Sequence, residues 1–145
     1  MNEEEYLKSR LVDQINWFDK KSQINQKQFK RLRLVEIVSA AIIPFLSGMG
    51  DKVPYSAWII GALGVMIALS AAFIALFKYQ ENWIAYRTTS EQLNHHHFMF
   101  LAGAQPYHTE DRFQLLVEHV EGILSKENSS WAVMSAQQSK GAKNK

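Results

Sequence analysis

YSAWIIGALGVMIALSAAFIAL, residues 55–76, is a run of 22 residues without a charged side chain. With Phe77 the run has 23 residues, and an α-helix of that length spans roughly 34 Å. The hydrocarbon core of a bilayer is about 30 Å thick. The run therefore predicts a transmembrane helix over residues 55–77. A buried core helix would need far more surrounding apolar chain than 145 residues supply.

A second, weaker apolar stretch, LVEIVSAAIIPFLSGM, covers residues 34–49. It is short, carries Glu36 near its start and contains Pro44, so alone it is also compatible with a re-entrant or interfacial segment. A membrane helix tolerates proline when a nearby hydroxyl such as Ser39 satisfies the freed carbonyl. The connector GDKVP, residues 50–54, has the Gly and Pro of a tight helix break. We therefore expect a two-span helical hairpin over residues 34–77 rather than a single span.

The basic residues predict the orientation of this hairpin. Cytoplasmic flanks of membrane spans carry an excess of Lys and Arg. Eight such residues flank the hairpin on the side of the two termini, and only Lys52 lies in the connector; the eight are Lys20, Lys21, Lys27, Lys30, Arg31, Arg33, Lys78 and Arg87. Both termini are therefore expected in the cytoplasm.

The composition excludes several other classes of protein. A net charge of +2 without a basic stripe does not indicate a nucleic-acid partner. Without cysteine, the chain has no disulfide, thiolate metal site or cysteine nucleophile. The motifs GxSxG, HExxH, GxGxxG and the P-loop are absent as well. We expect no catalytic residues, no cofactor and no enzymatic activity.

The polar parts of the chain predict helical arms on the cytoplasmic side. Residues 1–33 carry apolar side chains at three- and four-residue spacing (Leu7, Leu11, Ile15 and Phe18), which is one stripe of an amphipathic helix. The second span is expected to continue without a break to Leu101, since only small residues inside the membrane segment interrupt it. Residues 78–137 form the cytoplasmic helical region, and residues 138–145 a disordered basic tail that touches anionic headgroups.

A third helix is expected after a turn at Pro106. Its apolar positions follow a heptad pattern that Glu127 interrupts: Phe113, Val117, Val120, Leu124, Trp131 and Met134. The helix either packs on the other two arms or self-associates as a coiled coil. The expected fold class is all-α: a membrane helical hairpin whose two spans continue into a cytoplasmic three-helix bundle.

The membrane–cytoplasm juncture carries a dense set of polar and aromatic residues. Its members are Lys78, Tyr79, Glu81, Asn82, Trp83, Tyr86, Arg87 and Glu91. The aromatic residues lie on one side of a helix, where an interfacial belt is expected. Lys78 with Glu81, and Arg87 with Glu91, are spaced to pair along that helix. We expect this segment to pack on another arm.

The run His95-His96-His97 follows, and it does not form a metal site by itself. Adjacent helical residues point about 100° apart, and zinc sites on helices use i, i+3 or i, i+4 spacing. His108 and His119 could approach only through the tertiary fold. A solvated helix face is the ordinary expectation, with a metal site and a pH-responsive role, based on titration near neutrality, as alternatives.

Two features within the spans are candidates for function. Gly61, Gly64, Ala68 and Ala72 form a ridge of small residues that lets helices approach closely, in the hairpin, in an oligomer or in both. Glu36 is the one ionisable residue in the apolar runs. It is expected either at the interface, paired with Arg33 or Lys30, or in a polar conduit as the pore residue.

The segments WFDKKSQINQKQFKRLRLVEIVSAAIIPFLSG (17–48) and FKYQENWIAYRTTSEQL (77–93) resemble a bacterial family of unknown function, domain-of-unknown-function family 4231. That family is related to the SLATT domain, a two-transmembrane effector that accompanies SMODS and SLOG modules. The resemblance covers roughly residues 6–135. It implies a homo-oligomeric pore or channel-type effector, partnered by a cytoplasmic sensor or a nucleotide-signal system. By the resemblance, we expect a bacterial inner-membrane location and, in contrast to the effector pattern, no fused sensor.

Two further functions remain open from the sequence. One is a non-conducting membrane scaffold whose third helix and basic tail recruit a cytoplasmic partner. The other is a metal or pH sensor centred on the histidines.

Overall fold

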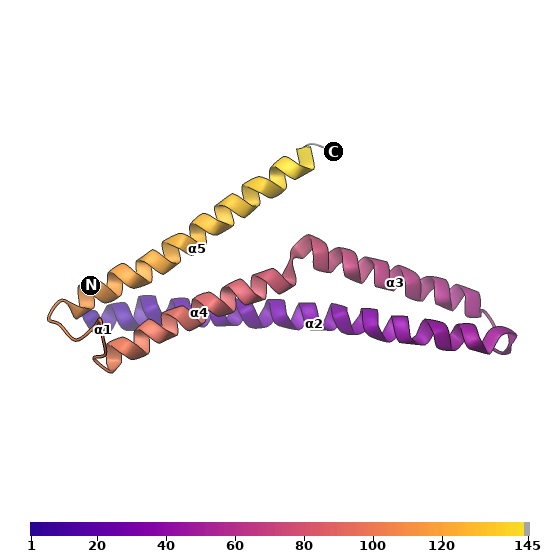
Figure 1. Cartoon of the computed structure of the whole chain (residues 1–145), viewed down its shortest axis with the longest axis horizontal. Helices are drawn as coiled ribbons and strands as arrows, with labels where there is room; N and C mark the ends of the chain where they lie inside the picture. Colours follow the sequence, from indigo (N-terminus) through magenta and orange to yellow (C-terminus); the bar gives the residue numbers. More distant parts are fainter. Residues whose placement is uncertain (144–145) are drawn as a thin grey trace. The chain divides into compact units, whose positions relative to one another are not determined.

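A computed structural model describes residues 1–143, and all regular structure in that range is helical. The short α1 (Glu3–Tyr6) and a π-helical turn, η1 (Leu7–Leu11), lead into α2 (Val12–Met49). A 3₁₀ turn, η2 (Gly50–Lys52), precedes α3 (Ser56–Phe77), which is followed by α4 (Tyr79–Leu101) and α5 (Arg112–Lys143) (Figure 1). The all-α prediction is confirmed.

The chain divides into two compact units. The terminal unit consists of residues Met1–Asp19 and the chain from Tyr86 onward, and the central unit is Lys20–Ala85. Each unit therefore combines segments from both sides of the turn at residues 50–55.

The terminal unit has one apolar core. Each helical segment buries a stripe of side chains in it, because residues three and four apart share a helix face. The buried residues are Tyr6, Leu11, Ile15, Phe18, Leu93, Phe100, Tyr107, Leu116, Val120 and Leu124. The predicted N-terminal stripe is confirmed, with Leu7 partly buried beside it. On α5 the heptad reasoning missed Leu116, and Met134 is exposed.

Polar contacts of Glu121 on α5 hold the N-terminal segment. Arg10 donates to both carboxylate oxygens, at 3.1 and 3.0 Å, and the Tyr6 hydroxyl donates to Oε1 at 3.0 Å. The hydrogen bonds from Arg10 lower the pKa of the Glu121 carboxyl, and those from Tyr6 act in the same direction. Because Arg10 and Glu121 are both substantially exposed, water screens this ion pair, and the apolar core contributes most of the stability.

In the central unit, the turn at residues 50–55 reverses the chain. The Ser22 hydroxyl donates to the carbonyl of Trp83 at 3.1 Å, which joins segments 61 residues apart in the sequence. The more protected residues of α3 recur every three or four positions: Ser56, Ile60, Leu63, Ile67, Ser70 and Ile74. Ser39 on α2 and Ser70 on α3 are buried.

The other apolar side chains of the central unit are largely uncovered. The two most apolar 18-residue windows have mean hydropathies of 1.7 and 2.5, and only 6% of the residues in each are buried. Phe45 is 69% exposed and Trp58 is 81% exposed. Both helices are thus long and apolar enough to cross a membrane, and they are not the buried core helices of this fold.

The helix boundaries differ from the predictions at two places. The tail expected to be disordered from residue 138 is instead helical to Lys143, and residues 144–145 lie outside the described range. The helix expected to run unbroken to Leu101 is interrupted after Phe77.

Two leucines of α4 should contribute very differently to the stability of the terminal unit. Leu93 is completely buried, whereas Leu101 is 60% exposed. Leu93→Ala should lower the free energy of unfolding by about 2–5 kcal/mol, because it leaves a cavity. Leu101→Ala, the matched control, should change it by about 0.5 kcal/mol or less. Thermal and denaturant unfolding in detergent, followed by circular dichroism, measures both. Equal losses for the two variants would contradict the described core.

Candidate functional site

The first part of the juncture is a break between α3 and α4 at Lys78. The backbone of Lys78 is left-handed, with φ 49° and ψ 43°, a conformation that costs an L-residue roughly 1–2 kcal/mol. The Lys78 N–H still donates to the carbonyl of Ile74, which closes α3. The Asn82 side chain donates to the carbonyl of Phe77 at 3.0 Å. This bond satisfies a carbonyl that the break would leave without a helical partner.

The break also changes the expected pairing within the juncture. Lys78 is out of helical register with α4, and in the described part of the chain no ion pair joins it to Glu81. The ring of Tyr79 lies 5.6 Å from that of Phe77. The indole N–H of Trp83 is buried and has no hydrogen-bond partner among the described residues.

The second part of the juncture begins at Tyr86 and belongs to the terminal unit. It contacts α2 and α5. Tyr86 stacks on Trp131 of α5 at 5.3 Å and meets the edge of Trp17 of α2 at 5.8 Å. Burial raises the pKa of the Tyr86 hydroxyl, and nearby Glu127 raises it further. Tyr86 is therefore a packing residue between α2, α4 and α5, as expected for a segment that packs on another arm.

Arg87 and Glu127 make the polar contacts around this aromatic cluster. Arg87 pairs with Glu91 at 2.6 Å, as its spacing predicted, and with Asp19 of α2 at 3.4 Å. Glu127 accepts from Thr89 of α4 at 3.2 Å and from the Trp131 indole at 2.9 Å. The residue that interrupts the heptad pattern of α5 is thus used for contacts to α4.

The histidine run is divided between three environments. His95 is exposed, and His97 is half-buried and stacked on Phe98 at 5.9 Å. His96 stacks on His119 of α5, with the ring centres 5.0 Å apart and the planes 16° apart. The expected solvated face thus describes His95 alone. The tertiary fold brings His119 to the run but leaves His108 exposed.

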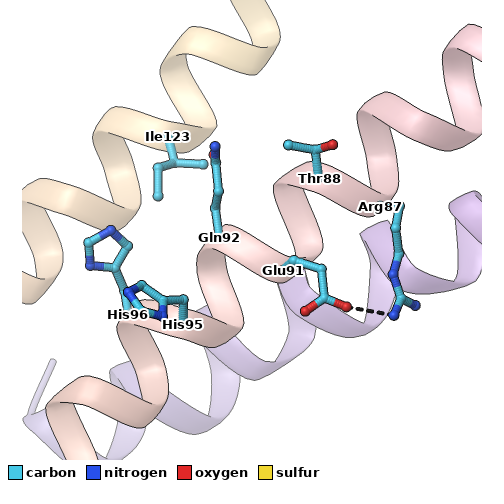
Figure 2. A pocket seen from close by; sticks show the side chains of 7 residues that line it. All are labelled: Arg87, Thr88, Glu91, Gln92, His95, His96 and Ile123. Atoms are coloured by element: carbon cyan, nitrogen blue, oxygen red, sulfur yellow. Dashed lines mark ion pairs between the residues drawn. The ribbon is translucent and has the colours of Figure 1, made fainter.

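A groove lined by residues of α4 and Ile123 of α5 lies beside the stacked histidines. Figure 2 shows the Arg87–Glu91 pair at one end and His95 with His96 at the other. Among residues 1–143, no group of three or more His, Cys, Asp or Glu side chains could hold a metal ion. The groove offers a charged pair and two imidazoles.

Glu36 lies in an ion pair in the central unit. Its carboxylate accepts from the Arg33 guanidinium at 2.7 Å and is 12% exposed, while Arg33 is more than half exposed. The guanidinium also lies 5.8 Å above the ring of Phe29. Arg33 is one of the two partners that the sequence offered for Glu36.

The ridge of small residues on α3 faces away from the protected stripe of that helix. Gly61, Gly64, Ala68 and Ala72 are all exposed. A Cβ atom added at Gly61 or Gly64 would meet nothing within 4 Å. The ridge therefore makes no close helix contact within the central unit.

The fold defines an all-helical protein with two helices long and apolar enough to cross a membrane. Residues 13–114 match the model of a family described as "Protein of unknown function (DUF4231)". The match covers more than half of the chain, and the chain belongs to this family. It includes Glu36, the ridge, the juncture and the histidine run, and it ends at the start of α5. No curated protein and no solved structure matches the chain.

The break at Lys78 predicts opposite effects of glycine at two positions. Lys78→Gly should raise the free energy of unfolding by about 1 kcal/mol, because glycine adopts the left-handed conformation without strain. Gln92→Gly, at an exposed position inside α4, should lower it by about 1 kcal/mol. Thermal unfolding in one detergent, followed by circular dichroism, compares the two. A loss of stability in Lys78→Gly similar to that in Gln92→Gly would indicate a continuous helix at residue 78.

Proposed function

We propose that this is a bacterial inner-membrane protein that forms an ion-permeable pore as a homo-oligomer. Residues 34–49 and 55–77 would be its two membrane spans, arranged as a hairpin with both termini in the cytoplasm. The observation that carries the proposal is the uncovered apolar surface of α2 and α3, of which Phe45 and Trp58 are examples. Side chains of this kind are stable in hydrocarbon and costly in water.

The ridge of small residues supports an oligomer. Two helices alone cannot enclose water, so a pore needs several copies of the hairpin. Membrane helices associate through small residues that allow close approach. Gly61, Gly64, Ala68 and Ala72 provide such a surface, and no part of the central unit covers it. The ridge is therefore the contact that we propose between copies.

Glu36 is the residue that we propose for ion permeation. A carboxylate within an apolar segment generally faces a partner or a polar cavity. In the single chain Glu36 has such a partner, Arg33. In an oligomer, copies of this pair would form a ring of charge at the cytoplasmic end of the first span.

The resemblance to the SLATT effectors supports the same class of function and adds partners. We propose that a cytoplasmic sensor protein or a nucleotide-signal system supplies the trigger, as the resemblance implies. The lipid bilayer is the other partner. The proposal includes no enzymatic activity, cofactor or nucleic-acid ligand.

Planar-bilayer recording together with a mass measurement of the oligomer in nanodiscs tests the proposal. The wild type should conduct and have a mass of several copies. Gly64→Leu should reduce both the oligomer and the conductance while the helix content stays the same, because the added side chain has space in the single chain. The matched control is Ala62→Leu, an exposed position on the opposite side of α3, which should behave like the wild type. A strictly monomeric, non-conducting wild type would overturn the proposal.

We predict that the substitution Glu36→Gln changes the ion selectivity of the pore. Replacing the carboxylate by an amide removes one negative charge per copy and should reduce the preference for cations over anions. Reversal potentials in asymmetric salt measure this preference. Asp51→Gln, in the connector outside the two spans, is the charge-matched control. An unchanged reversal potential in a conducting Glu36→Gln protein would remove Glu36 from the pore.

A second candidate function is a non-conducting scaffold that recruits a cytoplasmic partner through α5. It is favoured by the exposed apolar side chains in the last part of α5, such as Val133, which have no cover in the terminal unit. Liposomes distinguish the two functions. A scaffold should cause no leakage, and deletion of residues 109–137 should abolish the capture of its partner.

A further inference from the structure

The buried hydroxyl of Tyr107 lies between two imidazoles that come from different helices. Tyr107 is in the loop between α4 and α5 and is 0% exposed. Its oxygen lies 2.6 Å from Nδ1 of His96 on α4 and 3.2 Å from Nδ1 of His119 on α5. One loop side chain therefore connects the two helices that it joins in sequence. We call these three residues the histidine–tyrosine cluster.

The direction of each hydrogen bond in the cluster follows from its partners. His119 Nδ1 lies 2.8 Å from the carbonyl oxygen of Leu115, which can only accept, so this nitrogen carries a hydrogen. His119 therefore donates and cannot accept from Tyr107. The Tyr107 O–H then has His96 Nδ1 as its acceptor. Because that nitrogen must keep its lone pair, the cluster requires His96 to be neutral.

A proton on His96 reverses this arrangement. Its Nδ1 becomes a donor, and both imidazoles then present N–H groups to the Tyr107 oxygen. The hydroxyl hydrogen of a completely buried residue is left without an acceptor in the cluster, which is unfavourable. The imidazolium would also stack on His119 at 5.0 Å.

The groups that face His96 offer little compensation for a positive charge. They are His95 on the same helix, His119 on α5 and Tyr107 in the loop; none of them is a carboxylate. Glu91, in the adjacent groove, is paired with Arg87. Burial lowers the pKa of His96 below its ordinary value of 6.5, and the neighbouring His119 and His95 lower it further.

We propose that the histidine–tyrosine cluster is a pH-sensitive latch that holds the loop and the start of α5 on α4 at neutral pH and releases them in acid. A histidine with a lowered pKa stabilises the folded state fully above its unfolded pKa, and this stabilisation is lost as the pH falls through the folded value. The latch is thus closed above about pH 6.5 and opens below it. The proposal uses the terminal unit only and does not depend on whether the protein conducts.

Hydrogen–deuterium exchange of the full-length protein in detergent tests the latch at pH 7.5 and 5.5, with labelling times corrected for the intrinsic exchange rate. In the wild type, residues 102–120 should exchange several-fold faster at pH 5.5. His96→Gln should exchange equally at both pH values, because its amide oxygen accepts the Tyr107 hydrogen and does not titrate. Tyr107→Phe should exchange fast at both. His108→Gln, which changes an exposed loop histidine, should respond like the wild type.

Two results would overturn the proposal: equal protection of the wild type at both pH values, or a His96→Gln protein that still loses protection in acid. If His96→Gln does not fold, an NMR titration of the histidine resonances of the wild type decides the matter. The midpoint of the loss of protection must coincide with the titration of His96. Coincidence with the titration of His95 or of His97, the other half-buried histidine of the run, would reject the latch.

Discussion

The constraint on which the rest of the structure depends is that α2 and α3 carry more apolar surface than the chain can cover. In a chain of 145 residues, the apolar side chains outside the two spans are largely used in the core of the terminal unit. Within the central unit, α2 and α3 each shield only one narrow stripe of side chains from solvent. The remaining surface requires another environment, and this requirement is the reason for proposing both a bilayer and an assembly.

The terminal unit follows different rules, since its helices bury one face and leave the other in water. Its core joins the first residues of the chain to α5 through Tyr6, Leu11 and Val120. Polar groups within it are matched to partners on other helices, as with Glu127 of α5, which accepts a hydrogen bond from Thr89 of α4. Such matching specifies how α4 and α5 face each other, because a buried polar group without a partner is costly.

The all-helical fold class and the presence of two long apolar helices could be predicted because both features are visible in the local composition. An uncharged run and a three- and four-residue stripe are detectable without knowledge of the fold. The contact between His96 and His119 could not be found in this way, because it depends on how α5 packs on α4. Leu116 was missed for a similar reason: the heptad correctly included Val120 and Leu124, but it assigned Phe113 and Val117 to the seam, and these two are only partly buried whereas Leu116 is fully buried.

The break at Lys78 was missed because neither glycine nor proline marks it. The local signal was Asn82, whose side chain can reach a free carbonyl one turn back. Asn82 was predicted to belong to the juncture, but its hydrogen bond to the Phe77 carbonyl was not predicted. The ion pair of Glu36 with Arg33 was among the predicted contacts, since three-residue spacing brings two side chains together on any helix.

The break at Lys78 changes which positions of the following helix are shielded from solvent. If α3 continued unbroken, its protected positions Ser56, Ile60, Leu63, Ile67, Ser70 and Ile74 would be followed at intervals of three and four by residues 78, 81, 85 and 88. Up to residue 93, the protected positions of α4 are instead Tyr79, Asn82, Trp83, Ala85, Tyr86, Thr89, Ser90 and Leu93, so residues 78, 81 and 88 of the unbroken series are exposed and residue 85 alone is shared. Lys78 acts as a skip residue that turns the pattern by roughly 100°. The chain after Lys78 can therefore protect side chains such as Tyr79 and Trp83 at positions that an unbroken continuation of α3 would expose.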